Sequence, residues 1–165
     1  MMVDAAQRND VLRVATAADA AVIARHRVGM FRDMRVLDER EAVALEAGSR
    51  AHLTTTLANG AYLGWLIEHE GVVVAGAGVL LRATLPRPGY PQGGEEAYLL
   101  NVYTDPAHRR RGLARRLTEH VLTWCATRGI ARVSLHASDE GRPLYTTLGF
   151  VPTNEMRRDT TGHQA

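Results

Sequence analysis

The spacing of apolar residues along the chain predicts an alternation of strands and helices. Runs of about four to eight alternating or contiguous apolar residues indicate strands, and apolar residues three and four positions apart indicate helices. The elements expected in this way are strands at 11–15, 62–70, 72–84, 98–104 and 131–136, helices at 20–34, 39–57, 113–128 and 143–148, and short terminal strands at 150–151 and 155–157.

This order of elements is of the α/β class, with a largely antiparallel first half. The length of 165 residues suits one domain, which we expect at residues 10–158 between flexible tails at 1–9 and 159–165. In the second helix the residues expected to point inward are Ala42, Val43, Leu45, Ala51, Leu53 and Leu57.

Glycine and proline residues mark the turns between these elements. Glu70-Gly71 predicts a short hairpin. Gly76 and Gly78, inside the following strand, indicate either a bulge or a close backbone approach. Residues 85–94 are rich in proline and glycine, so they predict a mobile loop that is well placed to act as a substrate lid.

The composition is that of a soluble globular protein, with 45% hydrophobic and 23% charged residues. No apolar run approaches the roughly 20 residues that span a bilayer. Residues 1–10 carry acids and lack the apolar core of a signal peptide, and a single cysteine excludes an internal disulfide framework. We therefore expect a cytoplasmic protein that does not contact a membrane.

All 20 basic residues are arginine, which excludes a Schiff-base lysine and a Walker-type phosphate lysine. The net charge of +2 is too small for the general field of a nucleic-acid-binding protein. Positive charge is instead local, at residues 109–116.

The segment 98–117 predicts an anion site. A strand ends at Asp105-Pro106, arginines follow, and a helix begins near Leu113. The first amides of a helix lack internal partners and face its positive dipole end, so they bind phosphates. Gly112 lacks a Cβ and lets a phosphate approach closely, while arginines add bidentate phosphate binding.

Two motifs in this order carry a resemblance to a known family. Arg-x-x-Gly-x-Ala at residues 109–114, after a strand ending in Asp-Pro, resembles the acyl-CoA site of the GNAT superfamily of N-acetyltransferases. Tyr145-Thr-Thr-Leu-Gly-Phe150 resembles that family's Tyr-x-x-Leu-Gly-Phe signature. The resemblance implies a mixed, mostly antiparallel central sheet with helices on both faces, and acetyl-CoA as cosubstrate.

The resemblance also implies which residues hold acetyl-CoA. Backbone groups of Val102 and Thr104 would pair with the pantetheine arm, and the loop amides would bind the pyrophosphate. Ser138 stands where many relatives have an asparagine that bonds the pantetheine or the acceptor, although it could equally cap the next helix. The full expected set is Val102, Tyr103, Thr104, Arg109, Arg110, Arg111, Gly112, Leu113, Ala114, Arg115 and Ser138.

By the same resemblance Tyr145 is the general acid that protonates the departing thiolate, with packing as the alternative role. The expected general base is Glu96, which shares a strand face with Tyr98, the residue that aligns with a glutamate of relatives. A water relay through Asn101 or Tyr103, or a Glu96 that merely faces solvent, remains open.

The acceptor site is expected among the first two helices and the 85–94 loop, lined by Arg27, Phe31, Asp33 and Met34 together with Tyr98 and Asn101. A cationic amine would favour Asp33 and Glu96, whereas an acidic acceptor would favour Arg27 or Arg35. The seven histidines show no metal-ligand spacing, so no metal is expected, and His136 either lines the site or is structural.

The function predicted is transfer of an acetyl group from acetyl-CoA to a primary amine of a small molecule or peptide. The alternatives are a basic nucleic-acid-binding module, against which the sparse aromatic residues argue, and a CoA-binding regulator without catalysis. We expect no nucleic-acid partner, and a homodimer is left open.

Overall fold

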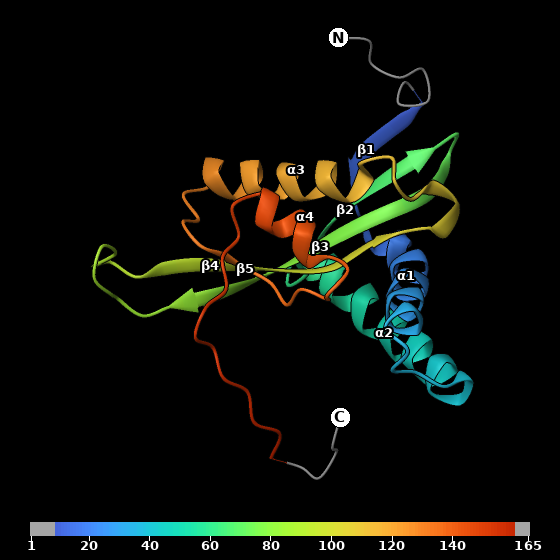
Figure 1. The fold of residues 1–165 in the computed structure, drawn as a ribbon, viewed down its shortest axis with the longest axis horizontal. Coiled ribbons are helices and arrows are strands. Elements are labelled where there is room, and N and C mark those ends of the chain that lie inside the picture. The colour runs from blue at the N-terminus through green and yellow to red at the C-terminus, as the bar shows by residue number, and fades with distance from the viewer. Residues whose placement is uncertain (1–8, 161–165) are drawn as a thin grey trace.

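The computed structural model describes residues 9–160. Its centre is a five-stranded sheet with the strands in sequence order, as Figure 1 shows. The strands β1, β2, β3 and β4 pair antiparallel in turn, and β4 pairs parallel with β5. The strands are β1 (Asp10–Val14), β2 (Leu63–His69), β3 (Val72–Thr84), β4 (Gly94–Thr104) and β5 (Val133–Ser134).

Helices cover both faces of this sheet (Figure 1). On one face lies α3 (Leu113–Thr127), whose Leu113, Leu117 and Val121 are buried against the strands in the larger core cluster. On the other face lie α1 (Ala20–Asp33) and α2 (Glu39–Asn59) over a second cluster. Short 3₁₀ helices occupy 17–19 and 106–108, and α4 (Arg142–Thr147) follows β5. The predicted fold class is therefore confirmed.

The turns form where glycine and proline predicted them. Glu70 and Gly71 both have positive φ, at 51° and 80°, as the tight β2–β3 hairpin requires. The helix α2 ends at Asn59 before a left-handed Gly60, and β3 and β4 flank a loop at 85–93.

The glycines inside β3 lie beside a bulge and a close approach, the two features that the sequence offered as alternatives. Between Gly76 and Gly78 the register with β4 shifts, so that Asn101 and Val102 together face Ala77 as a β-bulge. At Gly78 an added Cβ would overlap the ring and hydroxyl of Tyr62. The close approach is thus made by a side chain, and the bulge lies on the neighbouring strand.

The strands β4 and β5 pair over two positions only. Ala97 faces Val133 and Tyr98 faces Ser134, and no further pair joins the two strands among residues 9–160. A bulge bends its strand, and the one in β4 begins three residues after the last pair with β5. The second half of β4 is therefore left without a neighbour on its β5 side.

Several expectations from the sequence are wrong. The strand expected at 131–136 forms over only two residues, and the terminal strands at 150–151 and 155–157 do not form. The expected terminal strands would need a neighbouring strand to pair with, and β5, with two residues, is too short to be that neighbour. In α2, Val43 and Ala51 are exposed, because the helix buries only a narrow stripe that includes Ala42 and Leu53.

The tails expected at 1–9 and 159–165 lie mostly outside the residues described. Within the described part of the chain, no helix combines the length and apolarity needed to cross a bilayer.

We predict opposite effects of alanine at two glycines. Gly78→Ala should lower the free energy of unfolding by about 1–3 kcal/mol, because the methyl group displaces Tyr62 and its bond to Asn101. Gly48→Ala should raise it by about 0.5–1 kcal/mol, because Gly48 lies inside α2 with nothing near the added methyl. Urea denaturation measures both changes. An unchanged free energy of unfolding in Gly78→Ala would contradict the close packing of Gly78 against Tyr62.

Candidate functional site

The loop between β4 and α3 presents unpaired amides at a helix start. The first bond of α3 runs from the Arg116 amide to the Gly112 carbonyl, at 3.0 Å, so the amides of residues 113–115 have no acceptor within the helix. Arg110 and Gly112 have positive φ, at 63° and 76°. Gly112 precedes the helix in this left-handed conformation, and the space beside its Cα is open. This loop has the geometry of an anion site.

The arginine side chains of this loop mostly bind other parts of the protein. Arg109 donates from Nε to the Thr104 carbonyl at 2.9 Å and pairs with Asp33 at 2.6 Å. Arg115 donates to Thr147 Oγ1 at 2.6 Å, which ties α3 to α4. The arginines therefore fasten the loop to its surroundings, and its backbone amides are the groups left to receive an anion.

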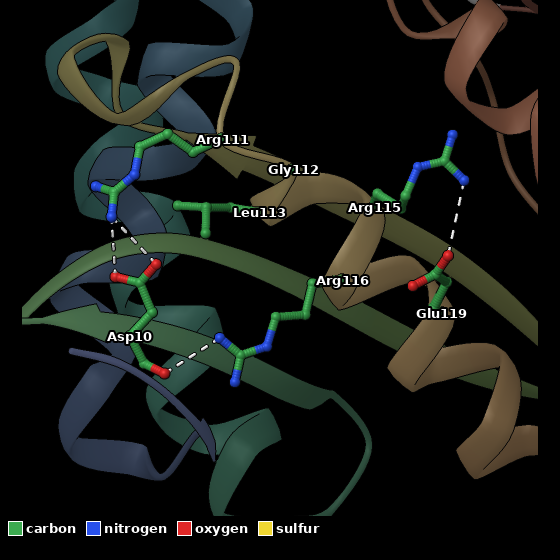
Figure 2. A pocket seen from close by; sticks show the side chains of 7 residues that line it. All are labelled: Asp10, Arg111, Gly112, Leu113, Arg115, Arg116 and Glu119. Atoms are coloured by element: carbon green, nitrogen blue, oxygen red, sulfur yellow. Dashed lines mark hydrogen bonds and ion pairs between the residues drawn. The ribbon is translucent and has the colours of Figure 1, made fainter. Parts of the chain in front are cut away.

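A cleft of about 400 Å³ lies beside the start of α3, and Figure 2 shows the side chains that line it. Arg111 and Arg116 point from opposite sides toward Asp10 at the start of β1, while Arg115 points away toward Glu119. Arg111 pairs with the Asp10 carboxylate at 3.2 Å, and Arg116 donates to the Asp10 carbonyl at 3.1 Å.

Asp10 is a residue whose part in this site the sequence did not reveal. Its carboxylate is fully buried and contacts His69 Nδ1 at 2.7 Å as well as Arg111. Because a buried carboxylate without a cation is costly, Asp10 fixes where Arg111 can lie and so fixes the loop. An aspartate before the first strand was the only available signal, and it does not distinguish this role from solvent exposure.

The free side of β4 exposes backbone groups to a ligand. The Asp105 amide donates to the Val74 carbonyl at 2.8 Å, and hydrogen-bonded pairs alternate along an antiparallel ladder. The N–H and C=O of Thr104, and by the same alternation of Val102, therefore point away from β3. Thr104 Oγ1 is buried without a hydrogen-bond partner among the residues described.

The bulge of β4 is held by a buried polar chain. Asn101 has φ of 53° and is 7% exposed. Its Oδ1 accepts from Arg27 Nη1 at 2.7 Å, and its Nδ2 donates to the Tyr62 hydroxyl at 3.1 Å. Burial raises the pKa of Tyr62 to about 12, so this hydroxyl stays protonated. The guanidinium of Arg27 also lies over the Phe31 ring, 5.0 Å from its centroid.

Tyr103 connects the end of β4 to α1. Its ring lies 5.0 Å from the ring of His26, and its hydroxyl occupies the space that a Cβ on Gly29 would need. Burial raises the pKa of Tyr103 and lowers the pKa of His26, and the negative charge of Asp105 only partly offsets the effect of burial on His26. Both side chains thus favour their neutral forms and hold β4 against the helix. Met34 is 46% exposed at the far end of α1.

Tyr145 packs on the α3 side of the sheet. Its ring contacts Phe150 edge to face at 5.7 Å and borders the same core cluster as Val102 and Leu113. Burial raises the pKa of its phenol. Ser138 Oγ accepts from the Gly141 amide at 3.1 Å, so its side chain closes the turn before α4.

Glu96 and Tyr98 lie further up β4, and each is already bound. Glu96 pairs with Arg132 at 2.7 Å and with Arg87 at 3.5 Å. The Tyr98 hydroxyl is hydrogen-bonded to His136 Nδ1, and the Arg82 guanidinium lies 4.2 Å from the centroid of its ring.

His136 has further contacts with the C-terminal segment. Its Nε2 lies 2.7 Å from Arg157 Nη2 and 3.7 Å from Glu155. These contacts hold the C-terminal segment next to the end of β5.

Ten of the expected site residues fall into three groups. Val102, Leu113 and Tyr145 border one core cluster on the α3 side. Arg27, Phe31, Asp33, Asn101 and Tyr103 meet between α1 and β4. Glu96 and Tyr98 form the third group with His136, near the pairing of β4 with β5. No cluster of three or more possible metal ligands occurs in residues 9–160.

Comparison with known proteins agrees with this geometry. The model of the acetyltransferase (GNAT) family matches residues 31–150, which is more than half of the chain. The protein belongs to the GNAT family of acetyltransferases. The resemblance seen in the two sequence motifs is thereby confirmed.

Individual relatives extend the comparison. A GCN5-related N-acetyltransferase from Ralstonia eutropha is 36% identical, with a TM-score of 0.84 over 93% of this chain and 99% of that one. A predicted acetyltransferase with acetyl-CoA from Clostridium acetobutylicum is 23% identical, with a TM-score of 0.81 over 92% of this chain and 96% of that one.

A curated relative shows a shorter match. The ribosomal protein bS18-alanine N-acetyltransferase of Escherichia coli is 34% identical over 77 residues, and the match covers 39% of this chain and 52% of that enzyme. The chain thus spans about half the length of the curated relatives it matches.

Proposed function

We propose that this protein transfers the acetyl group of acetyl-CoA to a primary amine of a small molecule or peptide. The observation that carries this proposal is the unpaired edge of β4, which leads directly into a loop of unpaired helix-start amides. An extended amide-containing arm that ends in a pyrophosphate matches both features in this order. Membership of the GNAT family supports the same activity.

The residues present fit acetyl-CoA, which supplies an activated acetyl group. Val102 and Thr104 would pair with the pantetheine arm, and the amides of Arg111, Gly112, Leu113 and Ala114 would bind the pyrophosphate. Because Arg109, Arg111 and Arg115 are held by intramolecular contacts, their side chains act here chiefly by orienting the loop and by charge. Ser138, already a turn cap, could still donate its hydroxyl proton.

Acetyl transfer forms a bond from the amine nitrogen to the acetyl carbon and breaks the bond to sulfur. The amide of Val102 would polarise the carbonyl oxygen. Tyr145 would give its proton to the departing thiolate, and its raised pKa keeps the phenol protonated before that step. The amine must lose a proton, and Glu96 is the acceptor proposed from the sequence.

The contacts of the arginines weigh against the nucleic-acid alternative. A cluster that binds duplex phosphates needs available guanidinium groups, whereas Arg109 and Arg115 are committed within the fold. Calorimetry with acetyl-CoA and with a random duplex at physiological salt separates the two functions. Acetyl-CoA binding alone supports the proposal, and salt-sensitive duplex binding alone contradicts it.

A CoA-release screen tests catalysis directly. Amines, amino acids, aminoglycosides and peptides form the panel, including a peptide that begins with alanine, which the match to the alanine N-acetyltransferase suggests. Acetyl-CoA binding without CoA release on any amine would instead favour a non-catalytic CoA-binding regulator.

We predict that Gly112→Val weakens acetyl-CoA binding while the fold survives. Valine places a β-branched side chain where phosphate should approach, and it strains a backbone with φ of 76°. Gly60→Val is the matched control, because Gly60 has φ of 77° and equally open space at the end of α2. Calorimetry should show reduced affinity for the first variant only; equal affinities would mean that the loop is not the phosphate site.

We predict that Tyr145→Phe lowers kcat by about 10²-fold and leaves the affinity for acetyl-CoA unchanged, because only the donated proton is lost. The ring contact with Phe150 is retained in this variant. Tyr90→Phe, in the exposed 85–93 loop, controls for loss of a hydroxyl elsewhere. An unchanged kcat, under conditions where chemistry limits the rate, would reduce Tyr145 to a packing residue.

The general base is tested by two parallel variants. If Glu96 takes the amine proton, Glu96→Gln should lower kcat/KM near neutrality and remove the acidic limb of its pH profile. His136→Gln is the comparison, because His136 is hydrogen-bonded to Tyr98 on the same part of β4. An effect confined to His136→Gln would transfer the role to that pair, and superimposable profiles would leave the amine to lose its proton to water.

A further inference from the structure

Arg27 is a cation held beside the proposed transfer site without a carboxylate partner. Its Nη1 donates to the side-chain amide oxygen of Asn101 at 2.7 Å, and its guanidinium lies over Phe31. Within residues 9–160 it forms no ion pair. Asn101 immediately precedes Val102, whose amide is proposed to polarise the acetyl carbonyl. The positive charge of Arg27 is therefore held next to the point of transfer.

The position of this guanidinium is set by rigid neighbours. Asn101 is buried in the bulge of β4 and donates to the buried hydroxyl of Tyr62. The ring of Phe31 supports the other side of Arg27. A guanidinium has five N–H donors in a planar fork, and the bond to Asn101 uses one of them. Arg27 thus retains donors in a preorganised orientation.

The acidic groups near α1 and β4 already have cationic or basic partners. Asp33 pairs with Arg109 at 2.6 Å, and Asp105 lies 3.7 Å from His26. Glu96, further up the strand, pairs with Arg132. The structure therefore pairs neither Asp33 nor Asp105 with Arg27. A carboxylate on the acceptor would supply the opposite charge that Arg27 lacks.

We propose that Arg27 binds the carboxylate of the acceptor, and that the acceptor is an α-amino acid with a free carboxylate. This inference rests on the proposed acetyltransferase function and names its substrate class. The fork of Arg27 pairs with the two carboxylate oxygens. In an α-amino acid one carbon separates the carboxyl group from the amine, so the amine lies close to the Val102 amide. Binding the carboxylate thereby orients the amine for attack.

The test compares matched pairs of acceptors that differ in one charge. Each L-amino acid of a panel is paired with its amide, for example L-alanine with L-alaninamide and L-phenylalanine with L-phenylalaninamide. The ratio of kcat/KM for acid over amide is measured by CoA release in the wild-type protein, Arg27→Gln, Arg27→Lys and Arg25→Gln. Comparing ratios between proteins cancels the different basicities of the two amines.

Arg25→Gln is the matched control because Arg25 lies on the same helix and is exposed, whereas Arg27 is partly buried. The wild-type protein should favour the acid, and Arg27→Gln should lower the ratio by about 10- to 100-fold, the usual worth of a charged bidentate contact. Arg27→Lys keeps the charge but loses the fork, so it should retain part of the ratio. If Arg27→Gln does not fold, the ratio measured for Arg27→Lys tests the inference in its place.

Two results would overturn the inference. The ratio could be the same in the wild-type protein and in Arg27→Gln, as when both kcat/KM values fall equally because Arg27 has a structural role, or the wild-type protein could prefer amides or a peptide that begins with alanine. In each of these cases CoA release still supports acetyl transfer. Failure of the proposed function is recognised separately, because then neither acetyl-CoA binding nor CoA release on any amine is detected.

Discussion

The structure depends on one interruption of hydrogen bonding, the bulge of β4 at Asn101. A continuous ladder would leave no room between β4 and β5 for an extended ligand. The extra residue bends β4 after only two pairs with β5, and the backbone of Val102 and Thr104 is left facing an open edge. The left-handed conformation of Asn101 is held by its side-chain amide, whose oxygen accepts from Arg27 and whose nitrogen donates to Tyr62.

The same bulge separates the two sides of the proposed reaction. On the α3 side, Val102 borders the core cluster that also contacts Tyr145. On the α1 side, Asn101 and Tyr103 contact Arg27 and His26. A donor arm along β4 would therefore have its acid on one face and its acceptor residues on the other. One irregular residue pair brings both sets to the same stretch of backbone.

The arginines near the start of α3 form ion pairs within the protein, so their charges stabilise the position of the loop. Arg111 reaches the buried Asp10 at the start of β1, and Arg109 reaches Asp33 at the end of α1. These contacts span large sequence separations and hold the loop between β4 and α3 from both sides. The loop can then present amides in a fixed arrangement, which is how a helix start selects an anion without relying on flexible side chains.

The sequence alone determined the local features, because each depends on residues adjacent in the chain. Helix starts and ends, the β2–β3 hairpin at Glu70-Gly71 and the glycine-containing loop before α3 follow from short-range spacing, from glycine and from proline. Irregularity around Gly76 and Gly78 could also be predicted, although the extra residue lies on β4.

Contacts between distant segments were decided only by the tertiary structure. The brief pairing of β4 with β5 and the absence of terminal strands depend on which edges meet. The partners of Asp10, Glu96 and Arg27 lie up to 106 positions away along the chain. Whether a charged side chain is neutralised or left to bind a ligand depends on those partners, and no local pattern encodes them.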